Sequence, residues 1–262
     1  GKPNSNTSTA FLTAASFLAY GNNLKVVRAL DGFATNAISA PPSSAQTLIY
    51  NTQVYSDTVL NTDGGNVYGP FAARYAGSIG NSLAISIVDA GSYSNTWNIN
   101  GVGVAGLFNG APGTSSQAAS YGSSNDEVHI VVMDVGGAFS GKQNTVLETF
   151  PYLSKGSNIT DSLGNSNWYK QVLLNKSKYI YAIDPPNYGV TNATWNKPAS
   201  NNWSFATIAA ANTVYLQGGF DAVPQDANTI TAFSKFVSPE DVNISLVVTG
   251  DASVTVQQYV ID

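Results

Sequence analysis

Residues 9–31 read TAFLTAASFLAYGNNLKVVRALD, and this stretch is the starting point for predicting the fold of the chain. Five of its apolar residues recur at helical spacing and predict an amphipathic helix with one buried face: Phe11, Leu12, Ala15, Leu18 and Ala19. Residues 20–23 are typical of a helix end and a turn. The LKVV sequence at residues 24–27 then predicts a short buried strand. Because the helix is too short to span a bilayer, we expect a core α/β unit.

The other end of the chain shows the same alternation of helix and strand. Residues 226–236 (DANTITAFSKF) predict a helix, residues 242–248 (VNISLVV) predict a strand, and Val254 begins a further predicted helix. We therefore predict an incomplete, discontinuous α/β domain assembled from both chain ends, residues 1–32 and 212–262.

The middle of the chain, residues 33–211, is predicted to be mostly β structure. Residues 83–89 form a predicted strand, and residues 126–153 form a predicted hairpin with a glycine-rich turn. Shorter strands are expected at residues 179–183 and 214–216. A further hairpin is expected at residues 47–60, inside a small insertion near residues 34–70. The predicted fold class is α+β, with a β-rich domain inserted into the α/β domain.

The composition argues against several classes of function. Charged residues make up 10% of the 262-residue chain, against about 25% in ordinary globular domains. The net charge of −5 and the lack of any Lys/Arg run argue against a nucleic-acid partner. With no cysteine, disulfides and thiolate chemistry are excluded. No apolar run approaches the roughly 18 residues of a membrane span, so we expect no membrane insertion.

Two glycine motifs resemble nucleotide-binding loops. GGAFSGKQ at residues 136–143 fits GxxxxGK, but Gln143 replaces the Ser or Thr that binds Mg²⁺, and a strand is predicted to follow where the motif needs a helix. A hairpin turn that uses its glycines for positive φ is the favoured interpretation. GVGVAG at residues 101–106 fits GxGxxG, but the following LFNGAPGTSS cannot form the helix that a dinucleotide site needs.

His129 is the single histidine, so a catalytic triad or a histidine metal site would have to use it. It lies in the predicted strand EVHIVVMD, where alternation predicts a half-buried or exposed side chain instead of a catalytic base. The carboxylates are scattered, and nothing selects a glycosidase pair among them. We therefore predict no catalytic, cofactor-binding or metal-binding residues, no cofactor and no enzyme activity.

Five segments occur in an order that carries a family resemblance. They are FLAYGNNLKVVRA (residues 17–29), YAGSIGNSLAISIVD (75–89), NDEVHIVVMDVGGAFSGKQNTVLETFPYLS (125–154), VYLQGGFDAVPQDANTITAFSKF (214–236), and PEDVNISLVVTGDAS with VQQYVID (239–253 and 256–262). Taken together, the chain resembles the contractile tail sheath proteins of myovirus-type bacteriophages.

The resemblance implies a structural function. Sheath subunits polymerise around the tail tube and contract on a baseplate signal, which drives the tube through the host envelope during genome injection. This depends on bistable interfaces, not on chemistry. The implied partners are further copies of the subunit, the tail tube and the baseplate proteins. The implied location is the virion tail sheath, after assembly in the host cytoplasm.

The resemblance also implies that this chain is a fragment lacking the N-terminal extension and the C-terminal domain of the family. Residues 33–211 would then form an outer domain, and the fragment alone is expected to be a monomer. The alternative is a secreted or surface β-rich carbohydrate-binding or hydrolytic protein. Four tryptophans leave that alternative open: Trp97, Trp168, Trp195 and Trp203. Such residues can line a sugar-binding groove, although they more often pack a core or an interface.

Overall fold

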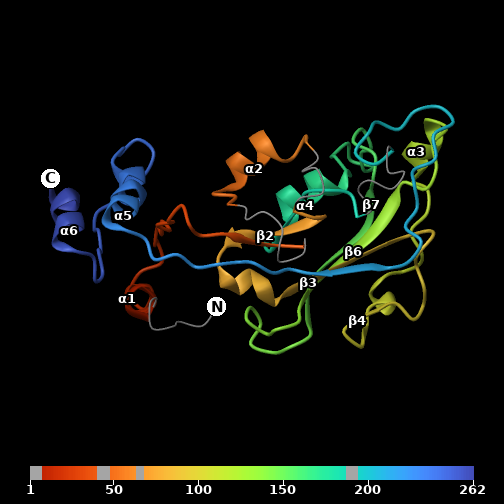
Figure 1. Ribbon diagram of the computed structural model, residues 1–262. Helices are drawn as coiled ribbons and strands as arrows, with labels where there is room; N and C mark the ends of the chain where they lie inside the picture. The colour runs from red at the N-terminus through yellow and green to blue at the C-terminus, as the bar shows by residue number, and fades with distance from the viewer. Residues whose placement is uncertain (1–7, 40–47, 63–67, 187–193) are drawn as a thin grey trace. The chain divides into compact units, whose positions relative to one another are not determined.

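The computed structural model describes residues 8–39, 48–62, 68–186 and 194–262 (Figure 1). The chain divides into two compact units: unit 1 comprises Gly1–Ala34 and Ala222–Asp262, and unit 2 comprises Thr35–Asp221. Helices occur together with antiparallel sheets, which confirms the predicted α+β fold class. The domain boundaries at residues 32–33 and 211–212 stay a prediction.

Unit 2 is built on a four-stranded antiparallel sheet with the order β7-β6-β3-β9. Its strands are β3 (Leu83–Asp89), β6 (Glu127–Asp134), β7 (Thr145–Ser154) and β9 (Asn212–Tyr215). A second sheet has the order β1-β2-β8, formed by β1 (Asn36–Ile38), β2 (Phe71–Ala76) and β8 (Ile180–Ala182). The strands predicted near residues 83–89, 179–183 and 214–216 and the hairpin at 126–153 are thereby confirmed.

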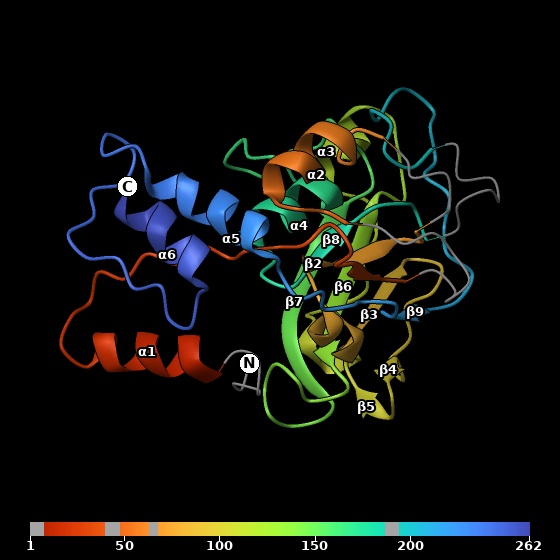
Figure 2. The same cartoon turned by 60° about the vertical axis from the view of Figure 1, so that its left-hand side comes forward.

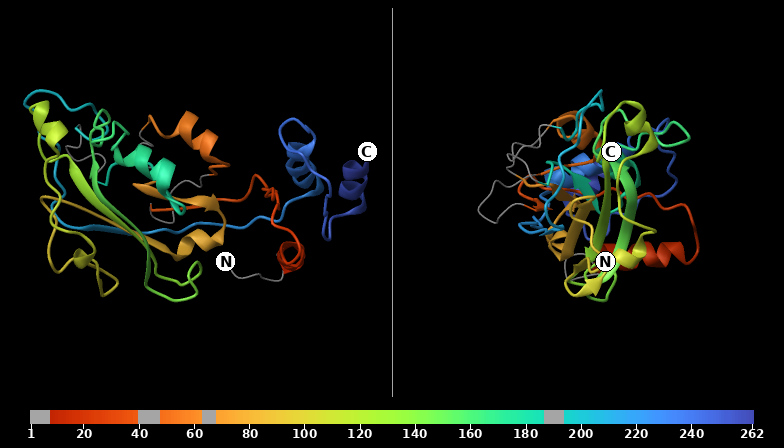
Figure 3. Two further views of the ribbon diagram at one scale, coloured as in Figure 1. Left: turned by 180° about the vertical axis from the view of Figure 1, so that it is seen from behind. Right: turned by 90° about the vertical axis from the view of Figure 1, so that its right-hand side faces the viewer.

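Both faces of the two inner strands of this sheet, β3 and β6, are buried. Alternate residues of β3 and β6, such as Ile85 and Ile130, face a core shared with helices α2 (Thr52–Thr58) and α4 (Tyr169–Lys176). The residues between them, such as Val131, face a second cluster that includes Trp97 and Phe108. Figures 1 and 3 show α2 and α4 on one side of the sheet and β4 on the other. Each fully buried Ile or Val side chain contributes roughly 1.5–3 kcal/mol relative to exposure.

The layer that covers the second face lies between β3 and β6 in the sequence. It contains the short hairpin of β4 (Asn98–Ile99) and β5 (Val102–Gly103), followed by the 3-10 turn η2 (Ala105–Leu107). Helix α3 (Ser116–Ser120) comes next in the sequence and packs through Ala118 in a third, smaller cluster with Ile159 and Phe205. The glycine-rich segment before β3 forms a 3-10 turn, η1 (Ser78–Ser82). These elements are too short to produce a clear hydrophobic period, which is why the sequence does not reveal them.

The predicted hairpin at residues 47–60 is wrong, because its described part forms helix α2. Asn51 caps this helix by accepting the N–H of Val54 through its side chain. Tyr55 stacks on Tyr181 with ring centroids 4.3 Å apart and donates its hydroxyl to the carbonyl of Ala182. A good cap and one buried aromatic residue thus outweigh the β propensity of this segment. Residues 40–47 and 63–67 of the predicted insertion lie outside the described residues.

Unit 1 contains the predicted helices at both chain ends: α1 (Ser8–Leu18), α5 (Asp226–Phe233) continued by η3 (Ser234–Phe236), and α6 (Val254–Ile261). Figure 2 shows α5 and α6 packed side by side. The predicted buried face of α1 is wrong, because none of its residues is buried and Leu12 is 60% exposed.

The strands predicted at residues 24–27 and 242–248 are also wrong. Both segments lack strand structure, and Val26 and Leu246 are 78% and 66% exposed. The backbone N–H and C=O groups of residues 24–27 and 243–248 form no hydrogen bond within the described part of the chain. A strand requires a partner for these groups, so a strand-type sequence without one does not form a strand.

Candidate functional site

The GGAFSGKQ motif lies in the turn between β6 and β7, and Asp134 at the end of β6 organises it. One carboxylate oxygen of Asp134 accepts the N–H of Gly137 at 2.9 Å and the hydroxyl of Ser82. The other oxygen accepts the N–H groups of Phe139 and Ser140 at 2.9 and 2.7 Å. Burial by itself would raise the pKa of Asp134, but the hydrogen bonds from Ser82 and Ser140 outweigh it and lower that pKa. The carboxylate therefore stays ionised.

This geometry opposes phosphate binding at the loop. In a nucleotide-binding loop, backbone N–H groups of this kind point at phosphate oxygens, whereas here they are donated to the Asp134 carboxylate. Gly137 has φ +81°, and a Cβ on Gly136 would lie 2.5 Å from the Ser82 hydroxyl oxygen, so the turn itself requires both glycines. The residues that follow form β7 and not a helix.

The second glycine motif also forms a turn. Asn100 and Gly101 have φ values of 49° and 80° and connect β4 to β5, as a tight hairpin turn requires. A 3-10 turn of three residues follows at Ala105–Leu107 in place of the helix that a dinucleotide site needs.

His129 is fully buried, so the prediction of a half-buried or exposed side chain is wrong. Its ring stacks on Phe108 with centroids 4.3 Å apart and meets the edge of Tyr152 at 4.5 Å. Nε2–H donates to the carbonyl of Gly110 at 2.9 Å, while Nδ1 accepts the N–H of Tyr152 at 3.0 Å. Burial lowers the pKa of His129, which the hydrogen bond to Gly110 partly offsets. Both nitrogens of this neutral imidazole are therefore already used within the protein.

A buried ion pair joins the ends of β3 and β7. The ammonium of Lys155 donates to Asp89 at 2.7 Å and to the carbonyls of Asn125 and Ala206 at 2.8 and 3.1 Å, and both charged side chains have no exposed surface. Asp89 also accepts the N–H of Ile208 at 2.8 Å. All three ammonium protons have acceptors, so the ion pair connects loops. Its ammonium group is not available to act on a ligand. The sequence offered no signal for this pairing.

The described part of the chain contains no group of three or more His, Asp or Glu side chains placed to hold a metal ion. Among its helices, none combines the length and apolar character that crossing a bilayer requires.

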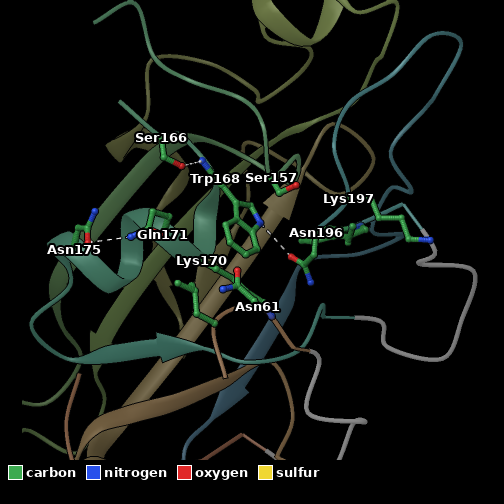
Figure 4. A pocket seen from close by; sticks show the side chains of 11 residues that line it. Asn61, Ser157, Ser166, Trp168, Lys170, Gln171, Asn175, Asn196 and Lys197 are labelled. Atoms are coloured by element: carbon green, nitrogen blue, oxygen red, sulfur yellow. Dashed lines mark hydrogen bonds between the residues drawn. The ribbon is translucent and has the colours of Figure 1, made fainter. Parts of the chain in front are cut away.

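A pocket of about 580 Å³ lies beside α4 (Figure 4). Two of the four tryptophans, Trp168 and Trp195, line it, whereas Trp97 is buried and donates its indole N–H to Ser86 at 2.9 Å. Amide and hydroxyl side chains supply most of the polar lining: Asn61, Ser157, Ser166, Gln171, Asn175 and Asn196. The sequence singled out the tryptophans but not these polar residues, because they come from four separate stretches of the chain.

Comparisons with known proteins give a partial similarity but no family assignment. No protein-family model matches the chain. A part of 145 residues, 55% of the chain, is 27% identical to the tail sheath protein of Salmonella phage ViI. The aligned part covers 19% of that protein, so this chain spans about a fifth of the length of the relative it matches. The similarity supports a structural role in a phage tail.

Proposed function

We propose that this chain is part of the structural subunit of a bacteriophage contractile tail sheath. In this proposal the subunits polymerise around the tail tube, and their contraction drives the tube through the host envelope during genome ejection. The observation that carries the proposal is the similarity of 145 residues to a tail sheath protein. Its partners would be copies of the subunit, the tail tube and baseplate proteins, within a virion assembled in the host cytoplasm.

We further propose that unit 1 is an incomplete α/β domain belonging to a longer polypeptide. Its unpaired segments, residues 24–27 and 243–248, line a groove of about 550 Å³ together with α1 and α5. Their apolar side chains and unpaired backbone groups are what an edge strand presents to an additional strand. Strands from the rest of the subunit would pair with the open backbone groups of both segments. Without them, the chain is expected to be a monomer.

Electron microscopy of the full-length parent protein tests the assembly. We expect hollow, striated tubes when the parent protein is purified alone or mixed with the tail tube protein. Shortening the parent protein to these 262 residues should abolish the tubes. Dispersed particles under both conditions would refute the sheath proposal.

Single substitutions test the role of the unpaired segments. In the parent protein, Val26→Asp or Leu246→Asp should prevent tube formation, because a charge would occupy a position that the proposal buries. Leu163 is a matched control, since it is 84% exposed in unit 2 and distant in sequence from both segments. Normal tubes from Val26→Asp and Leu246→Asp would contradict the proposed strand pairing. If Leu163→Asp also abolished the tubes, the effect of the Asp substitutions would be non-specific. That result would contradict the proposed strand pairing as well.

A further inference from the structure

We propose that the pocket beside α4 binds a short, uncharged sugar chain. The pocket is lined by residues near the end of α2, before and along α4, and at 195–197, all of which belong to unit 2. Its volume of about 580 Å³ lies within the range of roughly 300–1,000 Å³ that small-molecule pockets occupy. The proposal does not rest on the sheath function, because it uses the lining of this pocket alone.

The polar groups of the pocket match the hydroxyl groups of a sugar. The side-chain amide of Asn61 and the hydroxyl of Ser157 form no hydrogen bond with any described residue, and each can both donate and accept. Gln171 donates its amide N–H to Asn175 at 3.2 Å, which leaves the Gln171 carbonyl as an acceptor and the Asn175 NH₂ group as a donor. A sugar hydroxyl also donates and accepts at one atom, so this mixed set suits it.

The charges around the pocket favour an uncharged ligand. No carboxylate lines it, so the acid–base pair that sugar hydrolysis requires is absent from this lining and the proposed role is binding. Lys170 is 1% exposed and donates its ammonium to the carbonyl of Thr62 at 3.0 Å. The ammonium of Lys197 lies 5.9 Å from the ring centre of Trp203, and Figure 4 shows this side chain extending away from Trp168. The Lys170 ammonium is therefore engaged inside the protein, and the exposed Lys197 ammonium points away from the pocket.

The apolar part of the lining complements the C–H face of a sugar ring. Leu60, Trp168 and Trp195 contribute it through the small parts of their side chains that stay exposed, 6%, 7% and 3%. The indole N–H of Trp168 donates to the Asn196 side chain at 3.2 Å, which fixes both groups at the pocket wall (Figure 4). Aromatic residues with a polar handle suit ligands that are apolar on one side and polar on the other.

Saturation-transfer NMR and calorimetric titration of the 262-residue chain test the proposal. The probes are maltotriose and triacetylchitotriose as neutral sugars, and trigalacturonic acid as an acidic one. We expect binding of at least one neutral probe at millimolar concentration. Asn61→Ala and Gln171→Ala should each weaken it roughly fivefold through loss of one hydrogen bond. Asn201→Ala, an exposed amide that does not line the pocket, is the matched control and should leave binding unchanged.

Three results would overturn the proposal. One is the absence of saturation transfer from both neutral probes at 10 mM, a concentration about tenfold above a 1 mM dissociation constant. Another is binding that the Asn61 and Gln171 variants leave unchanged, since the ligand would then occupy another surface. The last is binding of trigalacturonic acid alone, which would identify a charge-driven contact. The tube-formation experiment can fail without affecting any of these measurements.

Discussion

Replacing Lys155 by Met removes the cation of the buried ion pair while keeping most of the side-chain volume. The substitution leaves the Asp89 carboxylate without its ammonium partner and removes a donor from the carbonyls of Asn125 and Ala206. Breaking one side of a buried pair costs about 3–5 kcal/mol of stability. Asp89 keeps the N–H of Ile208 and other local donors. We therefore expect a loss of about 3–4 kcal/mol, in the lower part of that range.

Urea denaturation followed by tryptophan fluorescence measures this loss. In a thermal denaturation experiment, the same loss of about 3–4 kcal/mol should lower the melting temperature by roughly 6–16 °C for a protein of this size. Lys142→Met is the matched control, because Lys142 is exposed and should change the free energy of unfolding by less than about 0.5 kcal/mol. The double variant Lys155→Met with Asp89→Asn should recover at least about 1 kcal/mol, since it removes the unpaired buried charge.

Two outcomes would refute this reasoning. A loss below about 1 kcal/mol for Lys155→Met would show that water or a rearranged loop compensates the carboxylate. A double variant no more stable than the single variant would show that packing, and not the uncompensated charge, accounts for the loss.

Three further predictions concern His129, the glycine-rich turn and the close packing of η1. Because burial lowers the pKa of His129, its contribution to stability is complete above the ordinary pKa of about 6.5 and is lost as the pH falls below it. The urea midpoint should therefore drop between pH 7.5 and pH 5, and His129→Gln should reduce that drop; an equal drop in both proteins contradicts the assignment. Asp134→Asn should lower the free energy of unfolding in urea by about 2–3 kcal/mol, because an amide donor would face backbone N–H groups. Lys142→Ala should leave that free energy unchanged. Calorimetry should detect no ATP binding to either of these two variants. Gly80→Ala should cost about 1–3 kcal/mol, because the added Cβ would lie 2.6 Å from the Cβ of Ala73; an unchanged melting temperature would show that the backbone yields there.

Several elements could be predicted because their signals are local. The apolar run of residues 83–89 and the hairpin around the glycine-rich turn form the predicted strands. The helices of unit 1 follow from their spacing and caps, such as the Ser253 hydroxyl that accepts the N–H of Val256. The lack of a long helix after each glycine motif could also be predicted, since the residues that follow do not favour one. In each case the decisive residues are close together in the sequence.

What the sequence by itself determined is therefore the set of strong local elements, the α+β class and the absence of cysteine chemistry. The tertiary structure alone decided the burial of His129, because residues 98–110 cover the sheet face that simple alternation left to solvent. It also paired Lys155 with Asp89 and gathered the amides of the pocket from separate stretches of chain. The strand-type residues 24–27 and 243–248 remain unpaired because the described part of the chain supplies no partner strand for them. A sequence pattern states what a segment prefers, but burial, ion pairing and strand formation each require a second surface that local sequence does not contain.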